Sequence, residues 1–162
     1  MPLIKHGRVV DEDWAFAEDD APLPDGQASV TLARFRTERE DLLKRNIPLG
    51  VRLNPEDDPH ELEGDLDHLS LIEVSFPKYA DGRGYSQAQL LRRRLGYEGE
   101  LRAVGDVLRD QALLMVRSGF DALELQNTDL PGFEAALAEF RNVYQGDALG
   151  NRSVFLRRHG EG

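Results

Sequence analysis

One short segment of the chain combines residue types that are suited to binding an anion. Residues 76–86 read FPKYADGRGYS, with Arg83 between Gly82 and Gly84. Glycine lets a backbone approach a ligand closely, and the arginine guanidinium binds planar or tetrahedral oxyanions through parallel donors. A helix starting at Ser86 would add N–H groups and the positive end of its dipole. These features predict an anion site formed by Lys78, Asp81, Gly82, Arg83, Gly84, Tyr85, Ser86, Asp106 and Arg109.

A structural interpretation of the same residues stays open beside this one. Asp81 and Asp106 would then pair with neighbouring arginines only to brace loops, and the glycines would only make turns. The segment is neither a P-loop nor the dinucleotide fingerprint GxGxxG, and the chain contains no GxSxG nucleophile elbow. The sequence thus leaves the catalytic residues unknown and does not decide whether the chain is an enzyme.

The elements that would position this segment follow a regular pattern. From residue 28 onward, apolar strand-like runs alternate with amphipathic segments that begin at capping boxes. Strands are expected at 29–35, 49–53, 71–76, 100–104 and 121–125, and helices from 37, 58, 86, 107 and 131. The alternation predicts an α/β fold with a mostly parallel sheet, either half-barrel-like or an open three-layer sheet. Ligands of such folds bind at the carboxyl edge of the strands, where the 77–86 loop is expected.

The chain divides by composition into three parts. Residues 1–27 form an N-terminal extension, with a hairpin-like pattern in LIKHGRVV and an acidic, proline- and glycine-rich loop after it. Residues 28–150 form the α/β domain, and residues 151–162 form a C-terminal strand or tail. A chain of 162 residues is long enough for one domain with a sizeable core.

Charge and composition exclude several classes of protein. The net charge of −10 disfavours general binding of nucleic acid or of anionic membrane surfaces. The longest apolar run is short and the N-terminus lacks a signal-peptide apolar region, so we expect a cytoplasmic protein. The absence of cysteine excludes disulfides, a thiolate nucleophile and cysteine-ligated iron–sulfur clusters on this chain. The cofactor is therefore unknown, with a flavin or a nucleotide left open.

Basic residues concentrate in one part of this acidic chain. Residues 1–70 hold eight basic and seventeen acidic residues, whereas residues 77–109 hold seven basic and four acidic ones. Arg92, Arg93 and Arg94 lie together in that basic part. They form either a docking patch for an acidic partner or an ordinary solvated helix face.

The acidic run EDDPHELEGDLDH, residues 56–68, superficially suggests metal ligands. Its acids mostly fall opposite the apolar stripe of Leu62, Leu66 and Leu69, so we interpret them as a solvated face. A metal site needs convergent ligands rather than many acids, and the sequence predicts none here.

Three segments resemble a known bacterial family, the domain of unknown function 934. They read FPKYADGRGYSQAQLLRRRLGY, GELRAVGDVLRDQ and RSGFDALEL, and the similarity extends from about Leu49 to Leu125. Members are typically encoded beside the haemoprotein of assimilatory sulfite reductase and are often labelled oxidoreductases of sulfite reduction. The family brings no established catalytic residues.

The resemblance implies an accessory protein of assimilatory sulfite reduction, docking on the sulfite reductase haemoprotein or on its electron donor. The alternative is an oxidoreductase or other enzyme that binds an anionic small molecule, or a phosphate-bearing cofactor, at the 77–86 loop.

Overall fold

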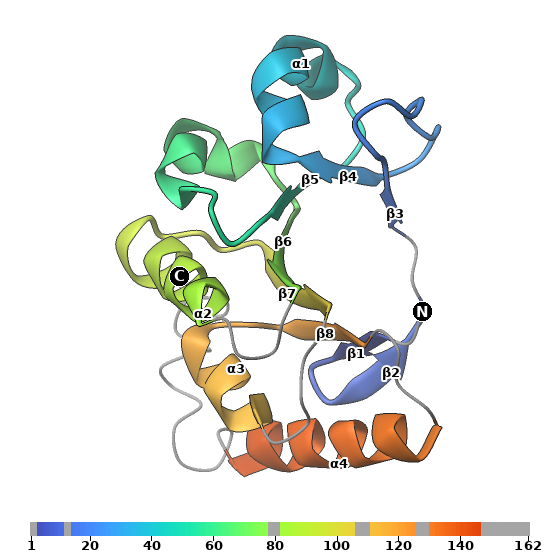
Figure 1. Cartoon of the computed structure of the whole chain (residues 1–162), viewed down its shortest axis with the longest axis vertical. Coiled ribbons are helices and arrows are strands. Elements are labelled where there is room, and N and C mark those ends of the chain that lie inside the picture. The colour runs from blue at the N-terminus through green and yellow to red at the C-terminus, as the bar shows by residue number, and fades with distance from the viewer. Residues whose placement is uncertain (1–2, 12–13, 78–81, 106–110, 126–129, 147–162) are drawn as a thin grey trace.

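Strands and helices alternate along most of the chain (Figure 1), and the computed structural model describes residues 3–11, 14–77, 82–105, 111–125 and 130–146. The N-terminal part holds strands β1 (Leu3–Lys5), β2 (Arg8–Val10) and β3 (Ala15–Phe16). There follow β4 (Ala28–Thr31), α1 (Leu32–Lys44), β5 (Leu49–Leu53), the 3-10 helix η1 (Pro59–His68), β6 (Leu71–Phe76), α2 (Arg83–Gln89), the π-helical turn η2 (Leu90–Arg94), β7 (Glu100–Gly105), α3 (Ala112–Ser118), β8 (Ala122–Leu125) and α4 (Leu130–Gly146). In the described residues, no helix is both long enough and apolar enough to cross a bilayer.

All eight strands belong to one sheet, in the order β2-β1-β8-β7-β6-β5-β4-β3. Strands β3 to β8 are parallel neighbours in chain order, and the β1–β2 hairpin pairs antiparallel with β8. The α/β class and the mostly parallel sheet expected from the sequence are therefore confirmed. The N-terminal residues contribute strands to both edges of this sheet, which the sequence did not indicate.

Covalent geometry requires this sheet to curl. Strand β2 ends at Val10 on one edge, and β3 begins on the other edge at Ala15, five residues further along the chain. Five extended residues span at most about 18 Å, whereas the edges of a flat eight-stranded sheet lie roughly 34 Å apart. Figure 1 shows the resulting arc, with α1, α2, α3 and α4 around its outside and β3 on its open side. Of the two architectures left open by the sequence, the half-barrel is the one observed.

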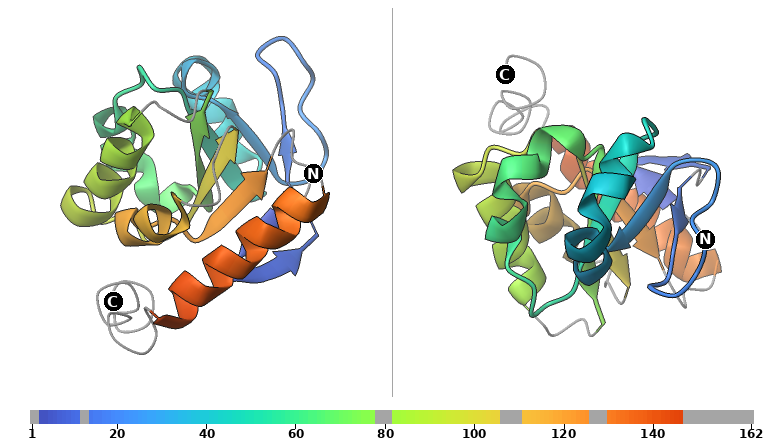
Figure 2. Two further views of the ribbon diagram at one scale, coloured as in Figure 1. Left: turned by 60° about the horizontal axis from the view of Figure 1, so that its bottom comes forward. Right: turned by 90° about the horizontal axis from the view of Figure 1, so that it is seen from above.

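The outer face of the arc carries the apolar core. Alternate residues of the strands, such as Ile72, Val74 and Phe76 of β6, point outward and are buried under the helices. Helices α2 and α3 lie over the middle of the sheet, and α4 lies against α3 and the β1–β2 hairpin (Figure 2). One apolar core therefore extends across the arc from Val30 of β4 to Phe140 of α4.

Two helices begin earlier than the capping boxes predict. Helix α1 starts after Thr31, whose hydroxyl accepts from the Arg34 N–H at 3.1 Å, while the expected cap, Thr37, lies inside the helix. Helix α2 starts after Gly82, and the expected cap, Ser86, is its fourth residue. Both predicted starts are wrong because buried aromatic residues, Phe35 in α1 and Tyr85 in α2, pack on the sheet from the first turns of these helices.

Other local predictions are confirmed. Asp58 caps η1 by accepting from the His60 N–H at 3.0 Å, and Pro59 takes the first helical position. Gly119 ends α3 in the left-handed conformation, with a φ of 108°. The LIKHGRVV segment forms the expected hairpin.

An ion pair joins α1 to η1 on the outside of the arc. The Arg39 Nε donates to the two Asp65 carboxylate oxygens at 3.0 and 2.9 Å. These hydrogen bonds hold the pKa of Asp65 below its ordinary value, although partial burial opposes them. The contact therefore stabilises the fold while Asp65 is ionised.

We predict that Asp65→Asn lowers the free energy of unfolding at neutral pH. The folded pKa of Asp65 is depressed, so the ion pair contributes above the unfolded pKa of about 4 and is lost as the pH falls through the folded value. The difference between wild type and variant should be largest near neutral pH and should shrink below about pH 4. Urea denaturation near neutral pH and below about pH 4 measures the free energy of unfolding of both proteins. An equal difference between wild type and variant under the two conditions would contradict the prediction.

Candidate functional site

The predicted anion loop lies at the carboxyl edge of the sheet. Strand β6 ends at Phe76 and α2 begins at Arg83, so Gly82 and the exposed Arg83 occupy the position expected from the sequence. Beside them β7 ends at Gly105, where a φ of 111° favours glycine and a Cβ would meet the Phe76 carbonyl oxygen at 2.5 Å. Four other predicted ligand residues, Lys78, Asp81, Asp106 and Arg109, lie outside the described residues.

The two glycines of this loop have different roles. A Cβ on Gly82 would meet nothing within 4 Å, whereas a Cβ on Gly84 would lie 2.5 Å from Cζ of Phe76. Gly84 is buried, and the Tyr85 ring packs on the Phe76 ring with 5.1 Å between centroids. Gly84 and Tyr85 therefore hold α2 against β6, and Gly82 is the glycine with open space beside it.

The amide hydrogens expected to receive an anion after Ser86 lie inside the helix. Helix α2 already begins at Arg83, and Ser86 is an exposed residue of that helix. The Tyr85 N–H donates to the Gly82 carbonyl at 3.2 Å. Among the predicted ligand residues that the structure describes, Gly82 and Arg83 are exposed at the start of α2.

A buried glutamine organises the neighbouring loop at the same edge. The Gln87 Nε2 of α2 donates to the carbonyl oxygens of Asn54 and Asp57, at 2.8 and 2.9 Å. The Asp57 carboxylate accepts from the Asn54 N–H at 2.8 Å, and burial raises the pKa of Asp57. Gln87 was not among the predicted residues, although it shares the helix stripe of Gly84, Ala88 and Leu91 at spacings of three and four residues.

The inner face of the arc carries charged side chains, which the sequence analysis also missed. Each of four neighbouring strands places one charged residue within an apolar run, with its side chain on this face; these are Arg52, Glu73, Arg102 and Glu124. Arg102 and Glu73 are each 2% exposed. A single charge in the middle of each of several apolar strands was the available sequence signal.

These inner charges are paired in ways that stabilise the arc. The Arg52 guanidinium donates to both Glu73 carboxylate oxygens at 3.1 Å and stacks over the Phe16 ring of β3 at 3.9 Å. Arg102 donates to Glu100 at 2.9 Å, and Lys5 of β1 donates to the same carboxylate at 2.7 Å. Since these contacts join β5 to β3 and β6, and β1 to β7, we assign Arg52, Glu73 and Arg102 to the fold rather than to a ligand.

The structure separates the three consecutive arginines that the sequence grouped as a docking patch. Arg92 is 4% exposed, and its Nη2 donates to Asp121 Oδ2 at 2.8 Å. The same guanidinium donates to the carbonyl oxygens of Gly119 at 2.9 Å and of Tyr97 and Gly99, both at 2.8 Å. The inclusion of Arg92 in a docking patch is therefore wrong, because its side chain is buried and paired with Asp121 inside the protein.

Arg93 and Arg94 instead lie on the surface. Both are exposed, and neither has a carboxylate partner among the described residues. They belong to the π-helical turn η2, in which the Leu95 N–H donates to the Leu90 carbonyl oxygen at 3.0 Å. The wide turn places Arg92 in the core and leaves its two neighbours outside, and such turns often occur at functional sites.

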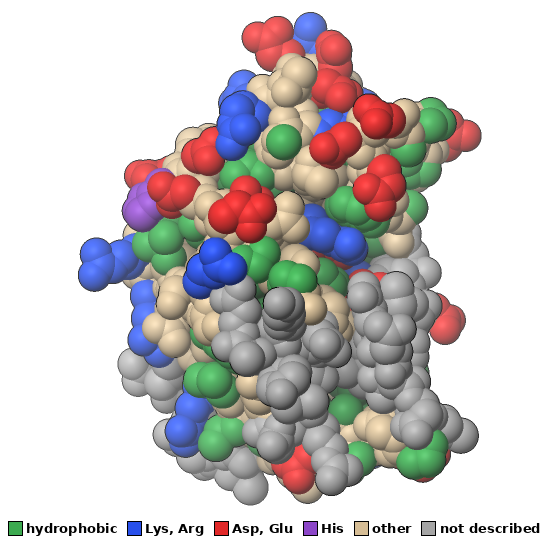
Figure 3. Space-filling view, viewed as in Figure 1, with side chains coloured by type: hydrophobic (Ala, Val, Ile, Leu, Met, Phe, Trp, Pro, Cys, Tyr) green, Lys and Arg blue, Asp and Glu red, His purple; other side chains and the backbone are tan. Residues whose placement is uncertain are grey.

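The distribution of charge over the surface follows the same division. Figure 3 shows acidic side chains gathered over α1 and the strands beside it, and basic side chains along the side where α2 and η2 lie. In the described residues, no group of three or more His, Asp or Glu side chains could hold a metal ion. Arg93 and Arg94 therefore lie on the basic side of a protein whose net charge is −10.

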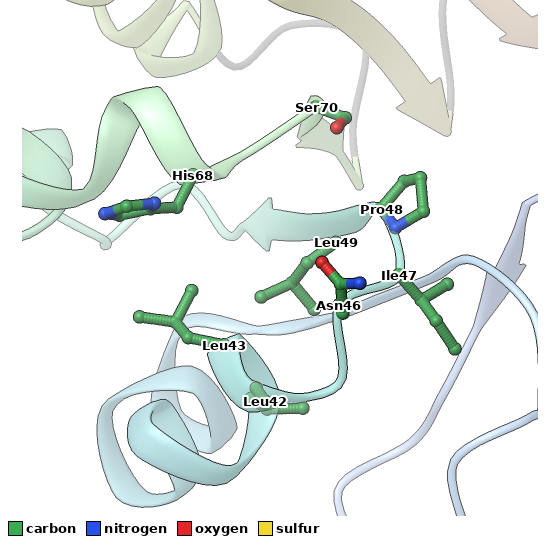
Figure 4. A pocket seen from close by; sticks show the side chains of 8 residues that line it. All are labelled: Leu42, Leu43, Asn46, Ile47, Pro48, Leu49, His68 and Ser70. Carbon is green, nitrogen blue, oxygen red and sulfur yellow. The ribbon is translucent and has the colours of Figure 1, made fainter.

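A pocket of about 300 Å³ lies at the opposite, amino edge of the sheet. Five of its eight lining residues are leucine, isoleucine or proline, and the other three are Asn46, His68 and Ser70. Figure 4 shows these three polar side chains apart from one another, with the His68 ring directed away from Asn46. Because ligands of parallel α/β folds bind at the carboxyl edge and these polar groups do not converge, we assign no ligand to this pocket.

We predict opposite effects for alanine at the two loop glycines. Gly84→Ala should destabilise the protein by about 1–3 kcal/mol, because the new methyl group overlaps the Phe76 ring. Gly82→Ala is the matched control, with a φ of −81° and open space, and should leave the stability unchanged or raise it by about 0.4–1 kcal/mol. Chemical denaturation measures both, and equal stability of the two variants would contradict the packing role of Gly84.

We predict that Arg92→Met destabilises the protein by about 3–5 kcal/mol, since it removes the guanidinium that pairs with the buried Asp121 carboxylate. Arg93→Met, one residue away on the surface, should change the free energy of unfolding by no more than about 0.5 kcal/mol. Comparable losses in the two variants would show that Arg92 is not the anchor of this segment.

Comparison with known proteins places the chain in a family. A family model described as "bacterial protein of unknown function (DUF934)" matches residues 50–155, which is well over half of the chain. No curated protein matches the sequence. The matched part contains β5 to β8 with the helices between them, including the carboxyl-edge loop and the arginines of η2. The chain belongs to the DUF934 family.

Proposed function

We propose that this chain is an accessory protein of assimilatory sulfite reduction that docks on the sulfite reductase haemoprotein or on its electron donor. The proposal draws its pathway from the family, whose members are typically encoded beside that haemoprotein. One structural observation supports docking: Arg93 and Arg94 are exposed side by side, with no carboxylate partner among the described residues.

Surface cations of this kind favour association with an acidic partner. Complementary charge mainly speeds diffusional encounter and orients the two proteins, with a smaller effect on final affinity. The rest of the chain repels acidic proteins, because its net charge is −10. A local basic pair on such a chain therefore selects one face for contact. The chain has no cysteine to ligate an iron–sulfur cluster, which fits an accessory part that acts beside a partner's redox centre.

We predict that the chain co-elutes with the haemoprotein of the same genome at low ionic strength and alters its sulfite turnover. The association should weaken as salt is added, because the Debye length falls from about 30 Å at 0.01 M to about 10 Å at 0.1 M. Size-exclusion chromatography and a sulfite reduction assay, with and without the chain, measure both effects. The same assays are repeated with the haemoprotein's electron donor as the candidate partner.

Absence of association with either protein at low salt, together with unchanged sulfite turnover, would refute the proposal. The absorption spectrum of the purified chain supplies a further control. A flavin spectrum would favour an enzyme that binds a phosphate-bearing cofactor at the 77–86 loop.

A further inference from the structure

We infer that the docking surface extends from η2 onto α3 and that its partner is an acidic protein surface with a small apolar centre. This surface, the basic helical face, consists of Arg93, Arg94, Leu113, Leu114 and Arg117. The inference rests on the proposed function, because it needs a protein partner, and it adds the location of the contact and the chemistry of the opposing surface.

Helix α3 presents two leucines and one arginine to solvent. Leu113 and Leu114 are each 45% exposed, whereas the following Met115 and Val116 are buried in the core. Arg117 is exposed and lies four and three residues after the two leucines, so these side chains share one face of the helix. Met115 and Val116 already pack this helix into the core. The two exposed leucines therefore have no role in the core packing of α3.

The two elements of the basic helical face lie next to each other. Helices α2 and α3 are in contact and lie side by side in both Figure 1 and Figure 2. Both connect parallel strands, so they run in the same direction and their carboxyl ends are adjacent. The Arg92 side chain fixes this arrangement, because it donates to the carbonyl oxygen of Gly119 directly after α3. Arg93 and Arg94 therefore lie near the end of α3 that carries Arg117.

Helix electrostatics explains only part of this surface. Cations near a helix carboxyl end stabilise the helix, which would account for Arg94 and Arg117 without any partner. It does not account for Leu113 and Leu114, which with Val9 are the large hydrophobic residues exposed in the described part of the chain. An apolar centre bordered by arginines is the usual composition of a protein–protein interface.

Charge complementarity decides which partner fits. In the described residues, Arg93, Arg94 and Arg117 have no carboxylate partner, so an acidic surface would supply their counter-charges. Three cations on a chain of net charge −10 are too few for general binding of nucleic acid or of an anionic membrane. The leucines then match a small apolar area at the centre of the acidic surface.

The test measures the dissociation constant of the chain for the haemoprotein and for its electron donor by biolayer interferometry at low salt. The double variants Arg93→Glu/Arg94→Glu and Leu113→Ser/Leu114→Ser should each weaken binding on the order of tenfold or more. Lys44→Glu is the charge-reversal control, because Lys44 is an exposed cation in the last turn of α1, on the acidic side of the protein. It should bind within about twofold of wild type. Thermal unfolding confirms that each variant is folded.

The possible binding results test the basic helical face and the proposed accessory role separately. Association of wild type and of all variants with equal affinity would overturn the basic helical face and leave the accessory role standing. No association of wild type with either protein would remove the accessory role and the surface with it. Vesicles of phosphatidylglycerol and a duplex DNA are further probes. Binding to either that is lost in Arg93→Glu/Arg94→Glu would overturn the assignment of a protein partner.

Discussion

The contact between Arg92 and Asp121 holds η2 and the end of α3 against the sheet. Two buried ions cost several kcal/mol each to desolvate, and they persist only when their hydrogen-bonding groups are satisfied. The Arg92 guanidinium meets this requirement with one carboxylate and three carbonyl oxygens. Asp121 in turn accepts from the Leu101 N–H at 2.9 Å, and its carbonyl accepts from the His6 N–H at 3.0 Å. One ion pair thus ties together η2, the end of α3, β7 and the N-terminal hairpin.

This anchor connects the fold to the proposed function. With Arg92 fixed in the core, the π-helical turn directs Arg93 and Arg94 to solvent beside the exposed leucines of α3. The inner face of the arc uses charge in the opposite way, because Arg52 and the buried Glu73 pair with each other between neighbouring strands. The position of each arginine in the fold, rather than its residue type, decides whether it holds the structure together or faces a partner.

Much of the fold could be predicted from local patterns. The apolar runs of β5 to β8 are short, are bounded by capping or turn residues, and form strands wherever tertiary packing agrees with them. The helix starts at Thr31 and Gly82 could not be predicted in this way, because Thr37 and Ser86 offer equally good local caps. The burial of Phe35 and Tyr85 decided between them, and that burial depends on strands distant in the sequence.

Local sequence patterns predicted only part of the candidate site as well. The place of Gly82 and Arg83 at the carboxyl edge followed from strand–helix alternation alone. The sequence pattern did not show that Arg92 is buried while Arg93 and Arg94 are exposed. Three identical neighbours give no pattern, and Asp121, which accepts from Arg92, lies 29 residues away along the chain. The role of Gly84 was likewise hidden, since only contact with the Phe76 ring distinguishes it from Gly82.

Arginine-specific chemical labelling, read by mass spectrometry on the chain alone and in complex with the haemoprotein or its donor, tests the central claim most directly. We expect Arg93, Arg94 and Arg117 to lose reactivity in the complex, while Arg36, on the acidic side of the protein, labels equally in both states. A complex in which Arg93 and Arg94 label as readily as in the isolated chain would contradict it.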